Sequence, residues 1–398
     1  MYNIHMRRLW DFFLVLWGKY ERVFWLGTLV LGFVFDLFLA KSPESVADNI
    51  LLVSYLFIAA ACIVLLNIHT LRSTKRAHAD LLSVTTGEPI LLILILQFCF
   101  GGLASNLLIL YGKSGTLGGS ALFVLLLAAF ALGNEFLKSR YALMRLNIAV
   151  YYFLLVTYLV IAVPTFVIHK IGMPAFLVSV AASAVVMLVL AAVLYVAVFR
   201  HNRRQLFEML ALVGTILLTF VGLYVLNIIP PVPLSLKSVG VYHSITVLPD
   251  AATRSDGARY AATLEPADWF VFWRDTSATF TVASSANASA TQRDLYTAAA
   301  GEDAYCFSAV YAPGGLSTPI VHRWEQYDTA AQKWQTRSLV SFAINGGRAD
   351  GYRGYTVETP SVGQWRCDVE TSSGQLIGRI SFAVVAATTT PTLSTTTL

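Results

Sequence analysis

Residues 226–234 read Leu-Asn-Ile-Ile-Pro-Pro-Val-Pro-Leu, and this stretch divides the chain into two parts of different composition. A run of prolines cannot continue a helix and acts as a stiff connector. Residues 1–229 carry 16 Lys or Arg and 9 Asp or Glu, whereas residues 230–398 carry 12 and 14. Over all 398 residues, 56% are hydrophobic and only 13% are charged, against about 25% charged in soluble domains. This composition excludes a disordered chain, a nucleic-acid-binding protein of the basic-patch kind and an ordinary cytosolic enzyme, and it predicts membrane helices.

Seven segments before the prolines are long and apolar enough to span a hydrocarbon core, which takes about 20 helical residues. They are Val23–Ala40, Asn49–Ile68, Pro89–Tyr111, Leu117–Phe136, Ile148–Ile168, Met173–Phe199 and Leu206–Ile229. The sequence thus predicts a transmembrane domain over residues 23–229. Residues 1–22 mix aromatic and basic side chains, which predicts an interfacial amphipathic segment or the start of a long, tilted first span.

Basic residues at the ends of these spans predict the orientation. Thirteen Lys or Arg flank the spans on one side, and three flank them on the other, namely Lys41, Lys113 and Lys170. By the positive-inside rule the N-terminus is cytoplasmic and residues 230–398 lie outside, periplasmic or extracellular. The predicted location is a multi-pass protein of the cytoplasmic membrane.

Four polar residues fall within predicted spans: Asp36, Gln97, Asn106 and Glu135. Hydrogen bonding between helices is the first interpretation, and a proton or substrate path is the alternative. The chain has no H-E-x-x-H helix, no G-x-S-x-G elbow and no Walker A loop. We therefore expect no catalysis, no cofactor and no metal site from its motifs.

Beyond a connector over residues 230–236, short runs of β-branched and aromatic residues alternate with turn residues. The expected strands are Val239–Leu248, Trp269–Trp273, Thr279–Ala283, Ala304–Tyr311, Ile320–Tyr327, Trp334–Ala343, Tyr352–Thr359, Trp365–Val369 and Gln375–Val384. Their number and spacing predict an all-β, immunoglobulin-like antiparallel sandwich over residues 237–385. The last two should form a hairpin that turns at residues 371–374. The Thr-rich tail, residues 386–398, is expected to be disordered.

Four cysteines are present. Cys62 and Cys99 lie within spans and read as small apolar residues. Cys306 and Cys367 lie in predicted strands outside the cytoplasm, where an oxidising compartment would permit them to pair. Two separate buried thiols are the alternative.

Aromatic and basic residues gather in two segments of the β region, residues 319–325 and 346–355. Such side chains on a β scaffold are typical contacts for an anionic glycan, a lipid headgroup or an acidic patch of an envelope protein. Alternation places His322 and Trp324 on one face of their strand, with Trp324 in the core, and Arg323 on the other face. The predicted ligand surface consists of His322, Arg323, Trp324, Arg348, Tyr352, Arg353 and Tyr355. An aromatic core with a charged, solvated face is the plainer interpretation.

Several short motifs carry a resemblance. They are Gly133–Phe136, Tyr305–Ser308, Val321–Trp324, Gly351–Tyr355, Trp365–Arg366 and Gly378–Phe382. With these motifs the chain resembles an uncharacterised bacterial multi-span membrane-protein family with a C-terminal extracytoplasmic domain of unknown function. The resemblance implies a bacterial envelope protein and assigns no catalytic residue. Cys367 stands where an apolar β-branched residue is more usual in that family, so a disulfide would be particular to this protein.

The predicted function is to hold a β sandwich at the outer membrane face for ligand or protein binding, in a sensory, scaffolding or envelope-assembly role. A transporter or channel with the sandwich as gate or docking platform is the rival. An envelope-glycan biogenesis enzyme is a third possibility, for which only Asp36 and His169 offer polar groups at the outer interface. The lipid bilayer is an expected partner. The second partner is left open among an anionic glycan, a lipid headgroup and an envelope protein, and assembly into a homo-oligomer is also left open. No nucleic acid is expected as a partner.

Overall fold

The computed structural model describes residues 43–79, 90–114, 120–137, 143–199, 202–247, 260–264, 294–298, 301–387 and 393–398. The first predicted span, Val23–Ala40, lies outside the described residues together with Asp36 and the amphipathic segment. The predicted strands Trp269–Trp273 and Thr279–Ala283 also lie outside them.

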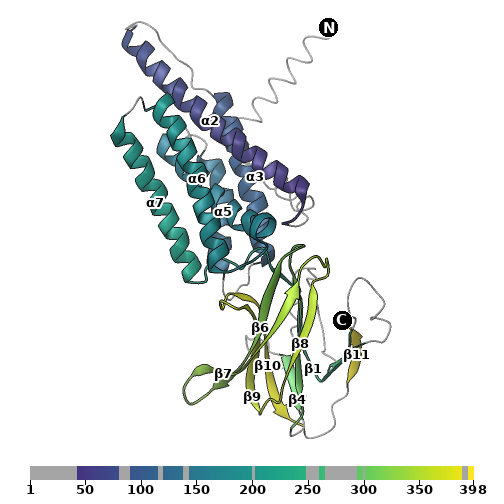
Figure 1. Ribbon diagram of the computed structural model, residues 1–398. Helices are drawn as coiled ribbons and strands as arrows, with labels where there is room; N and C mark the ends of the chain where they lie inside the picture. Colours follow the sequence, from purple (N-terminus) through teal and green to yellow (C-terminus); the bar gives the residue numbers. More distant parts are fainter. Residues whose placement is uncertain are drawn as a thin grey trace, which may run out of the picture. The chain divides into compact units, whose positions relative to one another are not determined.

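The N-terminal part is helical, and its elements follow the predicted spans (Figure 1). The helices are α2 (Val46–Ala79), α3 (Ile90–Ser114), α4 (Ala121–Leu137), α5 (Met144–Val163), α6 (Met173–Ala197) and α7 (Arg203–Val225). Five of them, all except α4, are long and apolar enough to cross a membrane, and α4 contains a shorter apolar helix, Ala121–Asn134. The described chain therefore has five or six apolar helices, as expected for a membrane protein.

The turn that follows α5 departs from α geometry. Pro164 has no N–H to donate, and the chain continues as one π-helical turn, η2 (Pro164–Ile168), in which the His169 N–H donates to the Pro164 carbonyl oxygen at 3.0 Å. His169 then leaves the helix with a left-handed φ of 54°. Turns of this kind are frequent at functional sites.

The chain divides into two compact units. One comprises residues up to Ile109, Leu125–Leu155 and Met187–Val213, and the other comprises Leu110–Val124, Val156–Val186 and Gly214–Leu398. The second unit thus contains the C-terminal ends of α3, α5 and α7 and the start of α6 together with all described strands. Within it, the Ser114 hydroxyl donates a hydrogen bond to the Leu234 carbonyl oxygen of the connector.

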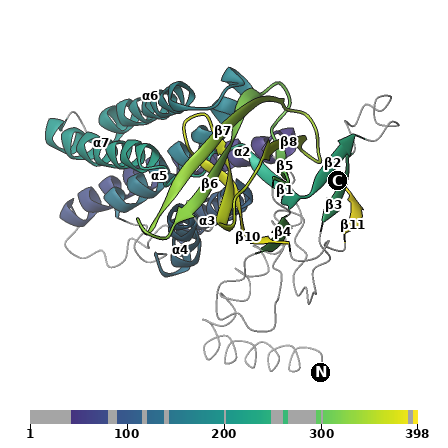
Figure 2. The same cartoon turned by 90° about the horizontal axis from the view of Figure 1, so that it is seen from below.

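The C-terminal part is a β domain, defined as residues 235–398. Its strands are β1 (Ser235–Tyr242), β2 (Ser244–Val247), β3 (Tyr260–Leu264), β4 (Asp294–Ala298), β5 (Ala304–Tyr311), β6 (Ser317–Asp328), β7 (Lys333–Asn345), β8 (Tyr352–Glu358), β9 (Gly363–Thr371), β10 (Leu376–Ala386) and β11 (Ser394–Thr397). They form a three-stranded sheet β1-β5-β8, a five-stranded sheet β4-β10-β9-β6-β7 and a small sheet β11-β3-β2 (Figures 1 and 2).

Strands with clear alternation lie where the sequence predicts them, and the β9–β10 hairpin turns at Thr371–Gly374 as expected. Three expectations need correction. The segment Val239–Leu248 is two strands that belong to different sheets, because β1 pairs with β5 and β2 with β3. Strand β4 was not expected, and it pairs in parallel with β10. The tail is not wholly disordered, because its β-branched threonines form β11 against β3.

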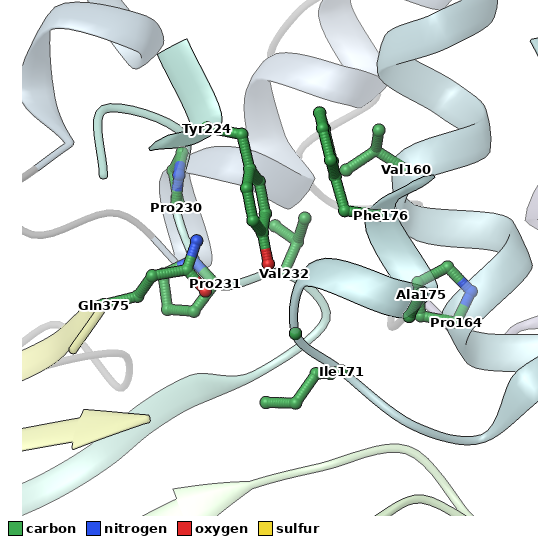
Figure 3. Close-up of a pocket in the computed structure, with 11 residues that line it drawn as sticks. Val160, Pro164, Ile171, Ala175, Phe176, Tyr224, Pro230, Pro231, Val232 and Gln375 are labelled. Carbon is green, nitrogen blue, oxygen red and sulfur yellow. The ribbon is translucent and has the colours of Figure 1, made fainter. Parts of the chain in front are cut away.

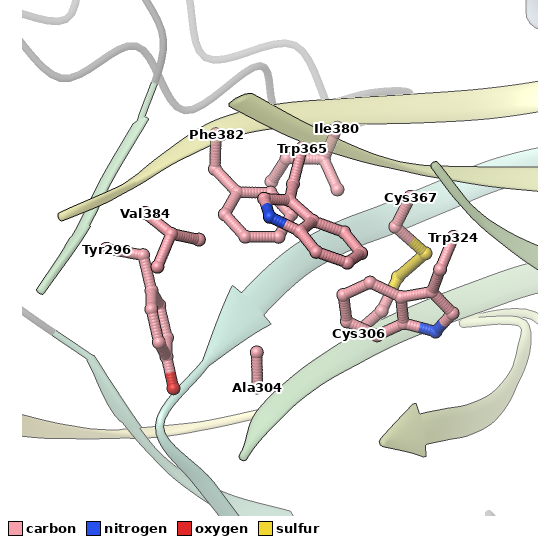
Figure 4. Packing of buried hydrophobic residues seen from close by; sticks show 9 residues of the cluster. All are labelled: Tyr296, Ala304, Cys306, Trp324, Trp365, Cys367, Ile380, Phe382 and Val384. Carbon is pink, nitrogen blue, oxygen red and sulfur yellow. A yellow bond between two sulfur atoms is a disulfide. The ribbon is translucent and has the colours of Figure 1, made fainter. Parts of the chain in front are cut away.

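The two larger sheets face each other across a shared core. Their main cluster combines Cys306 of β5 with Trp324, Trp365, Cys367 and Phe382 of the five-stranded sheet (Figure 4). Cys306 and Cys367, whose pairing the sequence left open, form a disulfide with an S–S distance of 2.09 Å, which links β5 to β9 and so one sheet to the other. Trp324 and Cys367 are register partners on neighbouring strands, and both are fully buried.

Thiol labelling of the full chain, unfolded without reductant, should modify two of its four cysteines, Cys62 and Cys99. With reductant it should modify all four. Since 61 positions separate the bonded cysteines, replacing both with Ala should lower the stability of the β domain by about 4 kcal/mol in the chain-entropy account. Cys62→Ala is the matched control, and four labelled thiols without reductant would contradict the bond.

Candidate functional site

A polar network crosses the core beside the disulfide. His322 is fully buried on the inner face of β6. Its Nε2 lies 2.8 Å from the Ser308 hydroxyl, and its Nδ1 lies 2.9 Å from the Thr356 hydroxyl. The Trp324 indole N–H donates to the same Thr356 oxygen at 3.0 Å. Burial lowers the pKa of His322 to about 4, so the imidazole is neutral at physiological pH and connects β5, β6 and β8.

Within the described residues, His322 and the two bonded cysteines form the group that comes nearest to a metal centre. Donor atoms of Cys306, His322 and Cys367 all lie within 4.8 Å of one another. Because the two sulfurs are bonded to each other, only the imidazole remains as a ligand, and Ser308 and Thr356 already engage it. The cluster therefore acts as a structural contact between the sheets.

His322 and Trp324 were included in the predicted ligand surface, but neither side chain reaches the surface, and the core position expected for Trp324 is confirmed. Each is 0% exposed. Alternation along β6 directs both side chains into the core, as the sequence indicated for Trp324. The sequence did not show that the imidazole would find hydroxyl partners on two other strands.

The opposite face of the five-stranded sheet carries three arginines and three carboxylates that pair with one another. We name it the charged face, and it consists of Arg323, Glu325, Arg366, Asp368, Glu370 and Arg379. Arg379, Asp368, Arg323 and Leu339 lie opposite one another on β10, β9, β6 and β7. Side chains directly or diagonally opposite on one face are close enough to interact.

Each arginine of the charged face is held by a carboxylate. Arg323 donates to Glu370 through Nε at 3.0 Å and Nη2 at 2.9 Å. Arg379 donates to both oxygens of Asp368, with Nε at 2.6 Å from Oδ1. Arg366 donates to Glu325 and lies 4.4 Å from the ring centroid of Trp334. The Arg379–Asp368 pair is bidentate, and both bonds of Arg323 go to one oxygen of Glu370. Two bonds to one carboxylate fix the guanidinium plane as well as its position.

The carboxylates are the buried members of these pairs. Asp368 is 1% exposed, whereas the side chains of Arg323 and Arg379 retain 30% and 34% of their surface. Burial raises the pKa of Glu370 above its ordinary value, although Arg323 donates two hydrogen bonds to it. The bond to Asp368 raises the pKa of Arg379, and the bond to Glu370 raises that of Arg323. The face therefore presents fixed guanidinium edges to solvent.

The remaining predicted surface residues lie elsewhere. On β8, Gly354 and Thr356 face the opposite sheet, because a Cβ on Gly354 would meet the Phe342 ring and Thr356 contacts His322. Alternation then directs Arg353 and Tyr355 outward from the three-stranded sheet.

The guanidinium of Arg348 lies 4.8 Å from the centroid of the Tyr352 ring, which packs on the core. Arg323 is on the outer face of the other sheet, in keeping with the expectation from alternation that these residues cannot all touch one ligand. Strand β8 pairs with β5 and not with β6, so Arg353 and Arg323 belong to different sheets.

Polar side chains of the described helices bond mostly to backbone. Asn106 Nδ2 donates to the Gly102 carbonyl oxygen of its own helix at 2.9 Å. Asn134 Nδ2 donates to the carbonyl oxygen of Gln97 on α3 at 3.2 Å. Close approach of the helices depends on small residues here, since a Cβ on Gly102 would lie 2.7 Å from the Tyr55 ring. Glu135 is the third residue from the C-terminal end of α4, and its side chain is not among those that the structure describes.

A small pocket lies in the second compact unit (Figure 3). The ends of α5 and α7, the start of α6, the connector and the β9–β10 turn line it. Tyr224 stacks on Phe176 with ring centroids 3.9 Å apart. The β9–β10 turn holds the backbone of Gln375, whose main-chain N–H donates to the Thr371 hydroxyl at 3.1 Å. This site could not be predicted from the sequence, because its residues come from five separate segments.

Comparisons with known proteins cover the β domain only in part. Residues 317–384, from the start of β6 to near the end of β10, match a family described as a protein of unknown function (DUF2914). This match fits an uncharacterised family defined by a C-terminal domain. None of the curated proteins matches the chain. Among solved structures, an alkylpurine DNA glycosylase, AlkC, of Pseudomonas fluorescens bound to abasic-site DNA aligns at 9% identity over 85% of this chain and 98% of that one, with a TM-score of 0.18. A score this low carries no argument on fold or function.

The buried histidine predicts a pH dependence. Its pKa of about 4 in the fold is below the ordinary value of about 6.5, so the unfolded chain binds more protons between these values. Stability should be complete above pH 6.5 and fall by about 3 kcal/mol on acidification to pH 4. Urea titration of the full chain with brief proteolysis of the β domain would measure it.

Since Glu370 has a raised pKa, it acts in the opposite direction and adds stability as the pH falls. The difference between the wild type and His322→Gln isolates the imidazole, because Gln keeps hydrogen-bonding groups and does not titrate. Equal pH profiles for the two proteins would contradict the assignment.

Proposed function

We propose that this protein is a seven-span membrane protein that displays its β domain outside the cytoplasm to bind a partner through the charged face. The N-terminus is cytoplasmic in this proposal, with thirteen basic flanking residues on that side and three on the other. A disulfide in the β domain is in keeping with an oxidising compartment.

The proposal includes an immunoglobulin-like sandwich. In that fold a buried tryptophan packs on a disulfide between the two sheets. Trp324 and the Cys306–Cys367 bond share one core cluster here, and the bond joins strands of different sheets (Figure 4). These features support the assignment, and the parallel pairing of β4 with β10 is a variation on an antiparallel plan.

The helices fit an anchor better than a transport path. Charged residues of the described spans occur only near helix ends, as with Lys113, Arg145 and Glu208. Arg145 and Glu208 pair at 2.6 Å, which joins the N-terminal ends of α5 and α7. Interior hydroxyls such as Thr165 and Ser179 donate to carbonyl oxygens four residues earlier. A transport path needs polar groups that are available to a substrate.

The observation that carries the binding role is the charged face. Buried carboxylates hold its arginines in place, while Arg323 and Arg379 keep about a third of their side-chain surface exposed. Leu339 lies in the same cross-strand row and is 56% exposed. Fixed guanidinium edges beside an apolar side chain suit a partner with carboxylate or phosphate groups and a small apolar part, such as an anionic glycan, a lipid headgroup or an acidic protein patch.

Protease added to intact bacterial spheroplasts should remove a C-terminal tag and leave an N-terminal tag whole. This result is expected because, in the proposed topology, only the β domain is accessible from outside the cell. A protected C-terminal tag on intact cells, with digestion only after lysis, would contradict the topology.

Arg323→Lys with Arg379→Lys should weaken partner binding by about tenfold, because Lys keeps the charge but loses the bidentate geometry. Lys also avoids leaving Asp368 and Glu370 buried without a cation, which would destabilise the domain. A photo-reactive amino acid at position 339 would cross-link a bound partner in cells. Position 357 on β8 is the matched site on the other sheet. Arg337→Lys is the control variant. Adducts that are unchanged in the double variant, or equal from both positions, would exclude the charged face.

A further inference from the structure

The disulfide between the two larger sheets lies beside a third side chain that can bind a metal ion. Donor atoms of Cys306, Cys367 and His322 all lie within 4.8 Å of one another, and all three residues are buried. They come from three different strands, β5, β9 and β6, and Figure 4 shows the two cysteines meeting between the sheets. A disulfide needs only its two cysteines, so the bond by itself gives no reason for an imidazole at this place.

The imidazole of His322 is held as a metal ligand is usually held. It is neutral, which is the form that binds metal ions. Its two nitrogens lie 2.8 Å and 2.9 Å from the hydroxyls of Ser308 and Thr356. A metal-bound histidine usually donates its other N–H to a fixed acceptor, which orients the ring. When one nitrogen of His322 binds an ion, the other therefore keeps a hydroxyl partner that holds the ring in place.

The separation and the type of the donors suit Zn²⁺. Zinc binds thiolate sulfur at about 2.3 Å and imidazole nitrogen at about 2.0–2.1 Å, so two donors on one ion are at most about 4.6 Å apart. The three donors of the cluster already lie within 4.8 Å of one another. Once the S–S bond is absent, the sulfurs can move apart to reach one ion. Two thiolates with an imidazole favour Zn²⁺ over Mg²⁺ or Ca²⁺, which prefer oxygen ligands.

We propose that the thiol form of this chain binds one Zn²⁺ ion through the sulfurs of Cys306 and Cys367 and a ring nitrogen of His322. The two thiols release two protons when they bind the ion, and a hydroxyl or a water completes the tetrahedron.

Oxidation converts the metal site into the disulfide. The two thiolates give two electrons to the disulfide of an oxidoreductase, which takes up two protons and becomes a dithiol. The S–S bond then forms between Cys306 and Cys367, and Zn²⁺ is released. The metal and the disulfide are thus alternative links between β5 and β9. This inference goes beyond the proposed function and does not depend on the charged face.

The test uses the full chain with Cys62→Ala and Cys99→Ala, so that Cys306 and Cys367 are its remaining cysteines. It is produced in cells that lack the oxidoreductase for envelope disulfides and is purified in detergent with a phosphine reductant and Zn²⁺. Metal analysis should find about one zinc ion per chain, and about a tenth of that or less after oxidation. Loading with Co²⁺ instead should give the visible and thiolate charge-transfer bands of a tetrahedral site.

His322→Gln separates the proposed site from binding by the cysteines alone. Loss of a residue that only supports a ligand costs about 10–100-fold in metal affinity, so loss of the ligand itself should cost at least about 100-fold. His243→Gln is the matched control, because His243 is also buried in the β domain but pairs with Glu302. It should leave the zinc affinity unchanged. Formation of the disulfide by His322→Gln on oxidation would show that this variant folds.

A reduced chain with His322 intact that holds no more zinc than the oxidised chain would overturn the proposal. The same holds for a Co²⁺ spectrum without the bands of a tetrahedral thiolate site, and neither result depends on the folding of a variant. Equal zinc affinity in His322→Gln would also overturn it, because the imidazole would then not be a ligand. Zinc that remains bound after the disulfide forms would place the ion elsewhere and would overturn the proposal as well.

Discussion

The β domain depends on one buried contact, in which Trp324 and His322 of β6 lie beside the disulfide that joins β5 to β9. This contact fixes the register of β6 between β7 and β9. In a strand, a shift by one residue would exchange the two faces. The inner face would then receive Arg323 and Glu325, which no apolar core could hold. The charged face is therefore a consequence of the core, because the same alternation that buries Trp324 turns Arg323 outward.

The two halves of the chain satisfy their polar side chains in different ways. In the helical part, hydroxyl and amide side chains such as Thr165 and Asn106 return their hydrogen bonds to backbone, as an apolar surrounding demands. In the β domain, polar groups bond to each other across strands, as Ser308, His322 and Thr356 do. The proline connector, residues 230–236, is the boundary at which one pattern replaces the other.

The sequence could predict those elements whose pattern is local. The β9–β10 hairpin follows from period-two alternation, strand β5 from its run of aromatic and apolar residues, and the apolar helices α2 to α7 from continuous hydrophobicity. Strands β3, β4 and β11 were not predicted, because short runs of Ala, Thr and polar residues carry no such pattern. The candidate sites needed strand order. Arg323 and Glu370 are 47 residues apart and meet only because β6 lies beside β9, whereas Arg353 lies on a strand of the other sheet. Gln375 could not be linked to Tyr224, since their proximity depends on the whole second unit.

The charged face contains three arginines and three carboxylates, so its formal charges cancel. Long-range attraction of an anionic partner would therefore be weak, since the fields of neighbouring opposite charges offset each other within a few ångströms. A partner of this face would be selected at short range by the fit of its acceptor atoms to fixed guanidinium edges. Its association rate would then change little with ionic strength, unlike that of electrostatically steered complexes, and selectivity would reside in the lifetime of the complex.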